Sequence, residues 1–143
     1  MLLDSGSIRL LLLSRQEVCQ LHDCLILRYG GLVGVRLNSA LMSAIESPKA
    51  YLSYRNENAK LPELAAVMAY EICKQHPFND GNKRTAALSI PLFMRTQGIR
   101  WRPRVNELIN KMLKVSRSDV SQRMDVVEEL AFWIQLSQAE EIV

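Results

Sequence analysis

One stretch of the chain decides the fold: the polar loop HPFNDGNKRT at residues 76–85, followed by the apolar run AALSIPLFM at residues 86–94. Gly81 permits backbone angles that other residues avoid, so successive N–H groups can turn toward one point. Asn82 suits the N-cap of a helix, and the open end of that helix carries partial positive charge. The pattern therefore predicts a tight loop that feeds a buried helix and binds an anion where the two meet.

The polar side chains of this loop fit phosphoryl or nucleotidyl transfer. Asp80 can hold a magnesium ion against a polyphosphate, and Lys83 and Arg84 can flank the same phosphates. His76 is left to deprotonate an attacking hydroxyl. Two cations at the positive end of a helix dipole lower stability, and a bound anion would offset that loss. This favours a ligand site over a merely solvated helix start.

The same residues match the signature loop of the Fic/Doc superfamily, His-Pro-Phe-x-(Asp/Glu)-Gly-Asn-(Gly/Lys)-Arg, at all eight specified positions. The chain resembles this family over about residues 10–136, and a single Fic/Doc domain over residues 1–143 is expected. Lys83 stands where AMP-transferring members usually carry glycine. In this respect the chain resembles the Doc, or death-on-curing, branch.

The resemblance implies a Doc-like toxin of a toxin–antitoxin pair. Such an enzyme transfers a phosphate from ATP, with Mg²⁺, to a Ser/Thr hydroxyl of a target protein and arrests translation; elongation factor Tu is the example target. A cognate antitoxin protein is the implied partner. The implied site residues are the catalytic base His76, the metal ligand Asp80, and the phosphate-binding Gly81, Asn82, Lys83 and Arg84.

Two alternative functions stay open. AMP-transferring Fic proteins carry glycine after the asparagine and a second arginine three residues after the first, whereas this chain has Lys83 and Ala87 at those positions. Both departures resemble Doc, in which ATP is thought to bind in the reversed sense. The other alternative is a non-catalytic relative that keeps the fold and an antitoxin groove, and the intact signature argues against it.

Residues 49–60 show no helical period and no caps. In Fic/Doc relatives the equivalent stretch is a flap or short hairpin that lies beside the active-site loop and aligns the target peptide. A target-aligning flap is therefore expected here, with an ordinary connector as the alternative. Its residues would be Tyr51, Leu52, Ser53 and Tyr54.

Helical periods and caps elsewhere predict an all-α bundle of about six helices. The first lies between a capping box at Ser14 and a stop at Gly30, and the second ends before Pro48. The helix from Asn82 is apolar nearly all round, so it is expected at the centre of the bundle, with a kink at Pro91. The helices after the first are expected over residues 39–46, 62–74, 82–97, 105–115 and 120–136.

The composition narrows the class of protein and its setting. Hydrophobic residues make up 48% of the 143, enough for one core without disulfides. The net charge of +3 and the lack of long basic runs speak against a nucleic-acid partner. No apolar stretch approaches the length of a membrane span. A cytoplasmic protein without membrane contact is expected.

The three cysteines and the second histidine, His22, lie outside the signature loop. Cys19, Cys24 and Cys73 form no C-x-x-C pair, so free thiols in a reducing compartment are expected. His22 follows Cys19 at a spacing of three, but no second pair completes a zinc site. Packing or a surface hydrogen bond is the expected role of His22.

Overall fold

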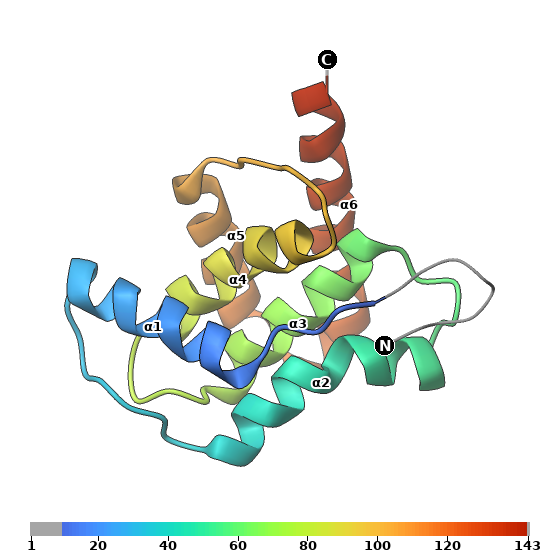
Figure 1. The fold of residues 1–143 in the computed structure, drawn as a ribbon. Coiled ribbons are helices and arrows are strands. Elements are labelled where there is room, and N and C mark those ends of the chain that lie inside the picture. The colour runs from blue at the N-terminus through green and yellow to red at the C-terminus, as the bar shows by residue number, and fades with distance from the viewer. Residues whose placement is uncertain (1–9, 143) are drawn as a thin grey trace.

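Six α-helices build the part of the chain that the computed structural model describes, which is residues 10–142, with side chains through residue 138 (Figure 1). This confirms the predicted all-α class. Residues 1–9 and 143 of the expected domain lie outside the described residues. The elements are α1 (Arg15–Tyr29), α2 (Asn38–Tyr54), α3 (Leu61–Gln75), α4 (Asn82–Thr96), α5 (Val105–Arg117), a 3₁₀ turn η1 (Val120–Gln122) and α6 (Arg123–Ile142).

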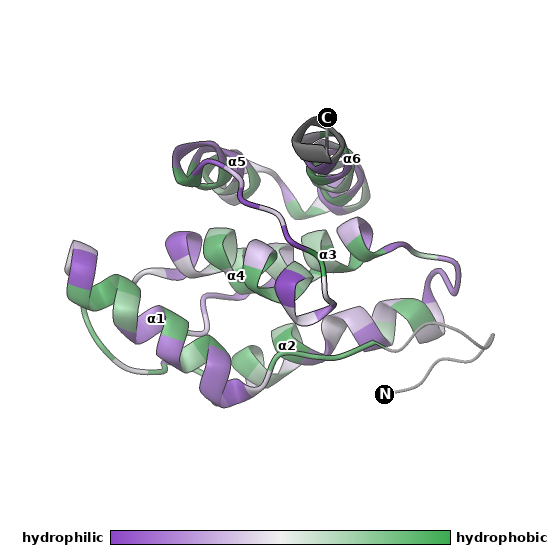
Figure 2. Ribbon diagram, turned by 45° about the horizontal axis from the view of Figure 1, so that its top comes forward, coloured by the Kyte–Doolittle hydropathy of each residue, from purple (hydrophilic) through white to green (hydrophobic). Residues whose placement is uncertain are grey.

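The helices form layers around α3. α3 packs against α2, α4, α5 and α6, whereas α4 packs against α1, α3 and α5. Figures 1 and 2 show α1 and α2 on one side of α3 and α4, with α5 and α6 on the other side. The helix from Asn82 therefore lies in the middle of the bundle, as predicted, and shares that place with α3, which packs against more of the other helices.

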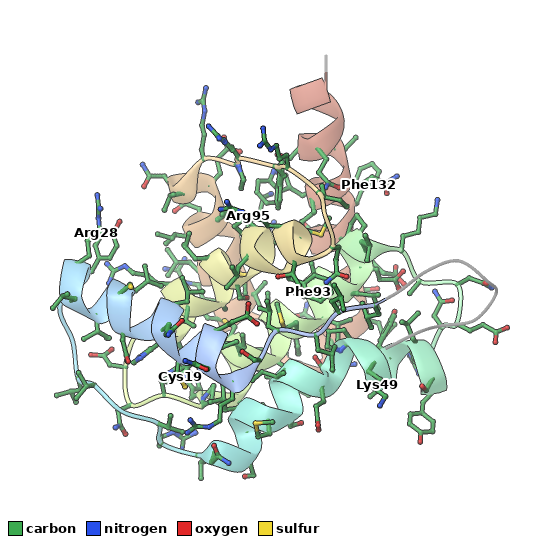
Figure 3. The ribbon with its side chains drawn as sticks, in the orientation of Figure 1. Cys19, Arg28, Lys49, Phe93, Arg95 and Phe132 are labelled. Atoms are coloured by element: carbon green, nitrogen blue, oxygen red, sulfur yellow. The ribbon has the colours of Figure 1, made fainter. Side chains whose placement is uncertain are left out.

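Small residues let α3 and α4 approach each other closely. Ala65 and Ala69 on α3 and Ala86 and Ala87 on α4 are fully buried. Larger side chains then fill the core around this seam, among them Phe93, which lies between the helices in Figure 3. Because packing at native density leaves little room for larger groups, side chains larger than alanine would not fit at these positions without a shift of the helices.

The start and end of α1 follow the predicted chemistry. The Ser14 hydroxyl accepts from the Glu17 N–H at 3.0 Å, and the Glu17 carboxylate accepts from the Ser14 N–H at 2.8 Å. This reciprocal pair is the expected capping box. The helix ends at Gly30, whose φ of 85° is open to glycine at little cost.

α2 contradicts the sequence prediction, because it runs through Pro48 to Tyr54 instead of stopping near residue 46. Proline has no N–H to donate to the carbonyl of residue 44. The Ser47 hydroxyl donates to that Ala44 carbonyl instead, at 2.7 Å. The carbonyl is therefore satisfied, and the helix continues past the proline.

The expected flap at residues 49–60 is corrected for the same reason. Tyr51, Leu52, Ser53 and Tyr54 form the last turn of α2, not a hairpin. Tyr51 and Leu52 are buried in the core, and the Tyr51 hydroxyl donates to Glu63. Their side chains cannot align a target peptide while they hold α2 against α3.

Pro91 lies within a continuous α4, which extends from Asn82 to Thr96. Five helices agree with their predicted ranges: α1 lies between Ser14 and Gly30 as predicted, the ends of α3, α4 and α5 differ by one or two residues, and α6 follows η1 and extends beyond residue 136 to Ile142. The kink expected at Pro91 stays a prediction. No helix within the described residues is long and apolar enough to cross a membrane.

Candidate active site

The loop between α3 and α4 borders a surface cavity of about 490 Å³. Residues from the loop and from the first turn of α4 form its polar walls, and α5 supplies an apolar rim. All six predicted site residues are therefore brought together at one cavity. The lining residues are His76, Asn79, Asp80, Gly81, Asn82, Lys83, Arg84, Ile109 and Leu113.

His76 ends α3 in a conformation that is rare for a residue with a side chain. Its φ of 50° and ψ of 61° lie in the left-handed region, and its side chain is exposed. Within residues 10–142 it is the one non-glycine residue with positive φ. Strain of this kind is retained where the surroundings hold it and is common at functional sites.

The connection between α1 and α2 holds the loop along one side (Figure 1). The Arg36 and Leu37 N–H groups donate to the Pro77 carbonyl at 2.7 and 3.0 Å, and the Asn79 N–H donates to the Gly34 carbonyl at 3.0 Å. Val35 and Phe78 form an antiparallel bridge. The segment that lies along the loop is therefore residues 31–37, and not the residues 49–60 expected from the sequence.

Asn82 closes the loop from within and is not the N-cap that the sequence predicts. Its side-chain amide accepts from the Phe78 N–H at 2.9 Å and donates to the Phe78 carbonyl at 3.0 Å. The N-cap position belongs to Gly81, with φ of 76°. Because both polar ends of the Asn82 amide serve Phe78, this buried side chain shapes the loop.

Asp80 points its carboxylate at two backbone N–H groups. Oδ1 accepts from Gly81 at 2.9 Å and Oδ2 accepts from Leu32 at 3.2 Å. A Cβ on Gly31 would lie 2.8 Å from Oδ2, so glycine is needed at this position for the close approach. The carboxylate is exposed but held in direction from both sides.

A magnesium ion at Asp80 would take its other ligands from water and substrate. Within the described residues, no group of three or more His, Cys, Asp or Glu side chains could enclose a metal. Mg²⁺ is usually held by one or two carboxylates together with waters and phosphates, so the single exposed carboxylate of Asp80 is consistent with this coordination pattern. The residues present are compatible with a metal that arrives with a polyphosphate.

The N-terminus of α4 is uncapped and lies at the cavity. It has no side-chain cap and no acidic residue in its first turn. Thr85 is the first α4 residue whose N–H is paired to the preceding loop, at 3.0 Å from the Gly81 carbonyl. The N–H groups ahead of it have no partner further back in the helix, and the exposed Lys83 and Arg84 stand beside them.

Two residues of α1, Tyr29 and His22, contact residues of the signature loop, and the sequence motifs did not predict either contact. The Arg84 guanidinium lies 4.5 Å from the centroid of the Tyr29 ring, and neighbouring Arg28 projects from the end of α1 (Figure 3). His22 is buried, with 1% of its surface exposed, which confirms the expected packing role. Its hydrogen bond to the Asp80 backbone comes from this buried ring and is not the surface hydrogen bond given as the alternative. Neither contact leaves a local signal, because the partners are distant in sequence.

The thiols are free, as expected, and none lines the cavity. Cys73 is buried in α3, and burial raises its pKa to about 11. Its Sγ donates to the Met112 carbonyl at 3.6 Å. Burial also raises the pKa of Cys19. These two thiols stay protonated near neutral pH and have no part in the chemistry of the site.

Comparison with known proteins agrees with this geometry. Residues 12–94 match the sequence model of the Fic/DOC family, and the chain belongs to that family. It is of the Doc type. Over 87 residues it is 38% identical to the protein kinase Doc of Escherichia phage P1, a match that covers 61% of this chain and 68% of that protein.

Proposed function

We propose that this protein is a Doc-type toxin that transfers a phosphate from ATP to a hydroxyl of a target protein. The observation that carries the proposal is that one cavity is lined by the exposed His76 and by the uncapped N-terminus of α4, which Lys83 and Arg84 flank. The base and the anion site line the same cavity. A protein substrate could therefore present its hydroxyl to His76 while a triphosphate lies against α4.

In the proposed reaction, the phosphates bind the free N–H groups at the start of α4 and the Lys83 and Arg84 side chains. His76 accepts the proton of the target hydroxyl as that oxygen attacks the γ-phosphorus, and the bond from the γ-phosphorus to the bridging oxygen breaks to release ADP. Asp80 would hold Mg²⁺, which, when bound, neutralises charge on the phosphate oxygens. Most catalysis of phosphoryl transfer lies in such positioning and charge stabilisation. Asn82 contributes through the shape of the loop, because its amide binds both polar groups of the Phe78 backbone.

Transfer of phosphate is preferred to transfer of AMP for two reasons. Lys83 fills the position where AMP transferases have glycine, and Ala87, at the position of their second arginine, is fully buried in α4. No side chain at that position reaches the cavity to clasp a terminal phosphate. In addition, the phage relative is named as a protein kinase. Elongation factor Tu is the first candidate target, and a cognate antitoxin is the proposed partner.

Intact-mass measurement of purified translation factors, incubated with the protein and Mg-ATP, tests the reaction. A gain of about 80 Da on one factor is expected for a phosphate, and an AMP adduct is roughly four times heavier. An AMP-sized gain would overturn phosphate transfer in favour of the Fic-type reaction. A non-catalytic, antitoxin-binding relative would instead give no adduct and would be as toxic to cells with His76→Ala as without it.

A further inference from the structure

We propose that His22 is a positioning residue for the active site and that it orients the Asp80–Gly81 backbone from inside the protein. Its consequence for catalysis rests on the proposed function, whereas its consequence for the loop does not. His22 belongs to α1 and lies 58 residues before Asp80 in the sequence. It is not part of the signature loop.

Two contacts join His22 to the loop. Nε2 lies 2.8 Å from the Asp80 carbonyl oxygen. The imidazole stacks on the Phe78 ring, with centroids 3.9 Å apart and planes 7° from parallel. His22 therefore touches the loop at both the buried anchor, Phe78, and the residue that carries the proposed metal-binding carboxylate.

The hydrogen bond has a defined direction. A carbonyl oxygen only accepts, so Nε2 of His22 carries the proton in this contact. Nδ1 lies 3.3 Å from a carboxylate oxygen of Asp23, whose side chain is 70% exposed. Nε2 is therefore the ring atom that joins His22 to the loop.

The bond acts on catalytic geometry through the Asp80 backbone. Its carbonyl is drawn toward α1, while its carboxylate lies on the side of the Gly81 and Leu32 N–H groups. A Cβ on Gly81 would lie 3.6 Å from His22 Nε2 and 3.2 Å from the Ile26 side chain, so the start of α4 packs directly on α1. Loss of the donor frees the peptide that sets both the carboxylate and the helix start.

Three variants separate positioning from packing. His22→Phe keeps a stacked ring but removes the donor, and His22→Gln keeps an amide donor near the place of Nε2. Val18→Ala is the matched control: Val18 is buried on the same helix, one turn earlier, and lines no part of the cavity. Should His22→Phe fail to fold, His22→Asn replaces it, because that shorter amide falls short of the Asp80 carbonyl.

The expected result is a loss of kcat for His22→Phe on the order of 10- to 100-fold, as misplaced groups produce. His22→Gln should recover most of that loss, and Val18→Ala should lower Tm without lowering kcat. In parallel, amide exchange of Phe78 and Asn79 should speed up at least about tenfold in His22→Phe, because the loop bonds that protect these amides open more often.

Two results would overturn the proposal. One is exchange at Phe78 and Asn79 that is the same in His22→Phe and Val18→Ala variants of similar Tm. The other is a His22→Gln variant as impaired in exchange as His22→Phe. A wild-type protein that transfers no phosphate would refute the proposed function, and the exchange comparison would still decide the role of His22.

Discussion

The guanidinium of Arg36 donates a hydrogen bond from Nε to the backbone carbonyl of His76 at 2.8 Å. Its Nη2 donates to the Gln75 carbonyl at 2.9 Å. These are carbonyls that the end of α3 leaves without helical partners. An arginine 40 residues upstream therefore caps the helix at the residue that turns into the left-handed conformation and presents its imidazole to the cavity.

Replacing Arg36 with Met should impair catalysis more than stability. His76 is an exposed residue, so the fold should lose only about 1 kcal/mol, whereas a displaced base should cost on the order of 10-fold or more in kcat. The KM for ATP should hardly change. Arg15→Met is the control. It also removes a hydrogen bond of an arginine, but that bond joins α1 to α2, from Arg15 Nε to Asn38 Oδ1 at 2.8 Å. Equal kcat for both variants would contradict this role for Arg36.

His76 should also show a trade between function and stability. Alanine at a position with φ of 50° keeps the steric cost of the left-handed region, and glycine does not. Both variants should be inactive, but His76→Gly should be about 1 kcal/mol more stable than His76→Ala in urea unfolding. An alanine variant as stable as the glycine variant would show that the backbone relaxes when the imidazole is removed.

Asn82 should behave as a structural residue of the loop. Asn82→Ala leaves the buried Phe78 N–H and carbonyl without partners and should lower the free energy of unfolding by about 2–4 kcal/mol. Asn106→Ala, at an exposed position on α5, should change it by less than about 0.5 kcal/mol. Chemical denaturation measures both. A small loss at Asn82, with unchanged folding but weaker ATP binding, would instead assign the amide to the phosphates.

Tyr51 should make stability depend on alkaline pH. Burial, followed by the bond to the Glu63 carboxylate, raises the pKa of Tyr51 to about 12 from 10. Its stabilising effect is therefore complete below pH 10 and is lost as pH rises toward 12. Tyr51→Phe should cost about 1–2 kcal/mol at pH 8 and progressively less above pH 10. Tyr54→Phe, which alters a 90% exposed ring in the same turn, should show neither effect.

The loop and most helices could be predicted because their signals are local. Gly81, the capping box at Ser14 and the apolar run after Asn82 each restrict the backbone within a few residues. The end of α2 could not, because Pro48 normally signals a stop, and the compensating bond from Ser47 to Ala44 forms only once the helix exists. The expected flap was wrong as a consequence.

The supports of the site could not be predicted for a different reason. Arg36 and His22 contact backbone carbonyls, which every residue possesses, at separations of 40 and 58 residues. No pattern of side chains in the sequence records which carbonyl will be met. Tertiary packing brings α1 and the α1–α2 connection to the loop, so only the three-dimensional structure shows that these two side chains bind the loop backbone.

Labelling with radioactive ATP tests whether this protein transfers the γ-phosphate of ATP to a target protein with His76 as the base. Wild-type protein, His76→Ala and Asp80→Asn are each incubated with a bacterial lysate and ATP that carries the label at either the γ- or the α-phosphate. We expect a labelled protein with γ-labelled ATP and wild-type protein alone, and none with the α-label. Labelling from the α-phosphate, or equal labelling by His76→Ala, would contradict this expectation.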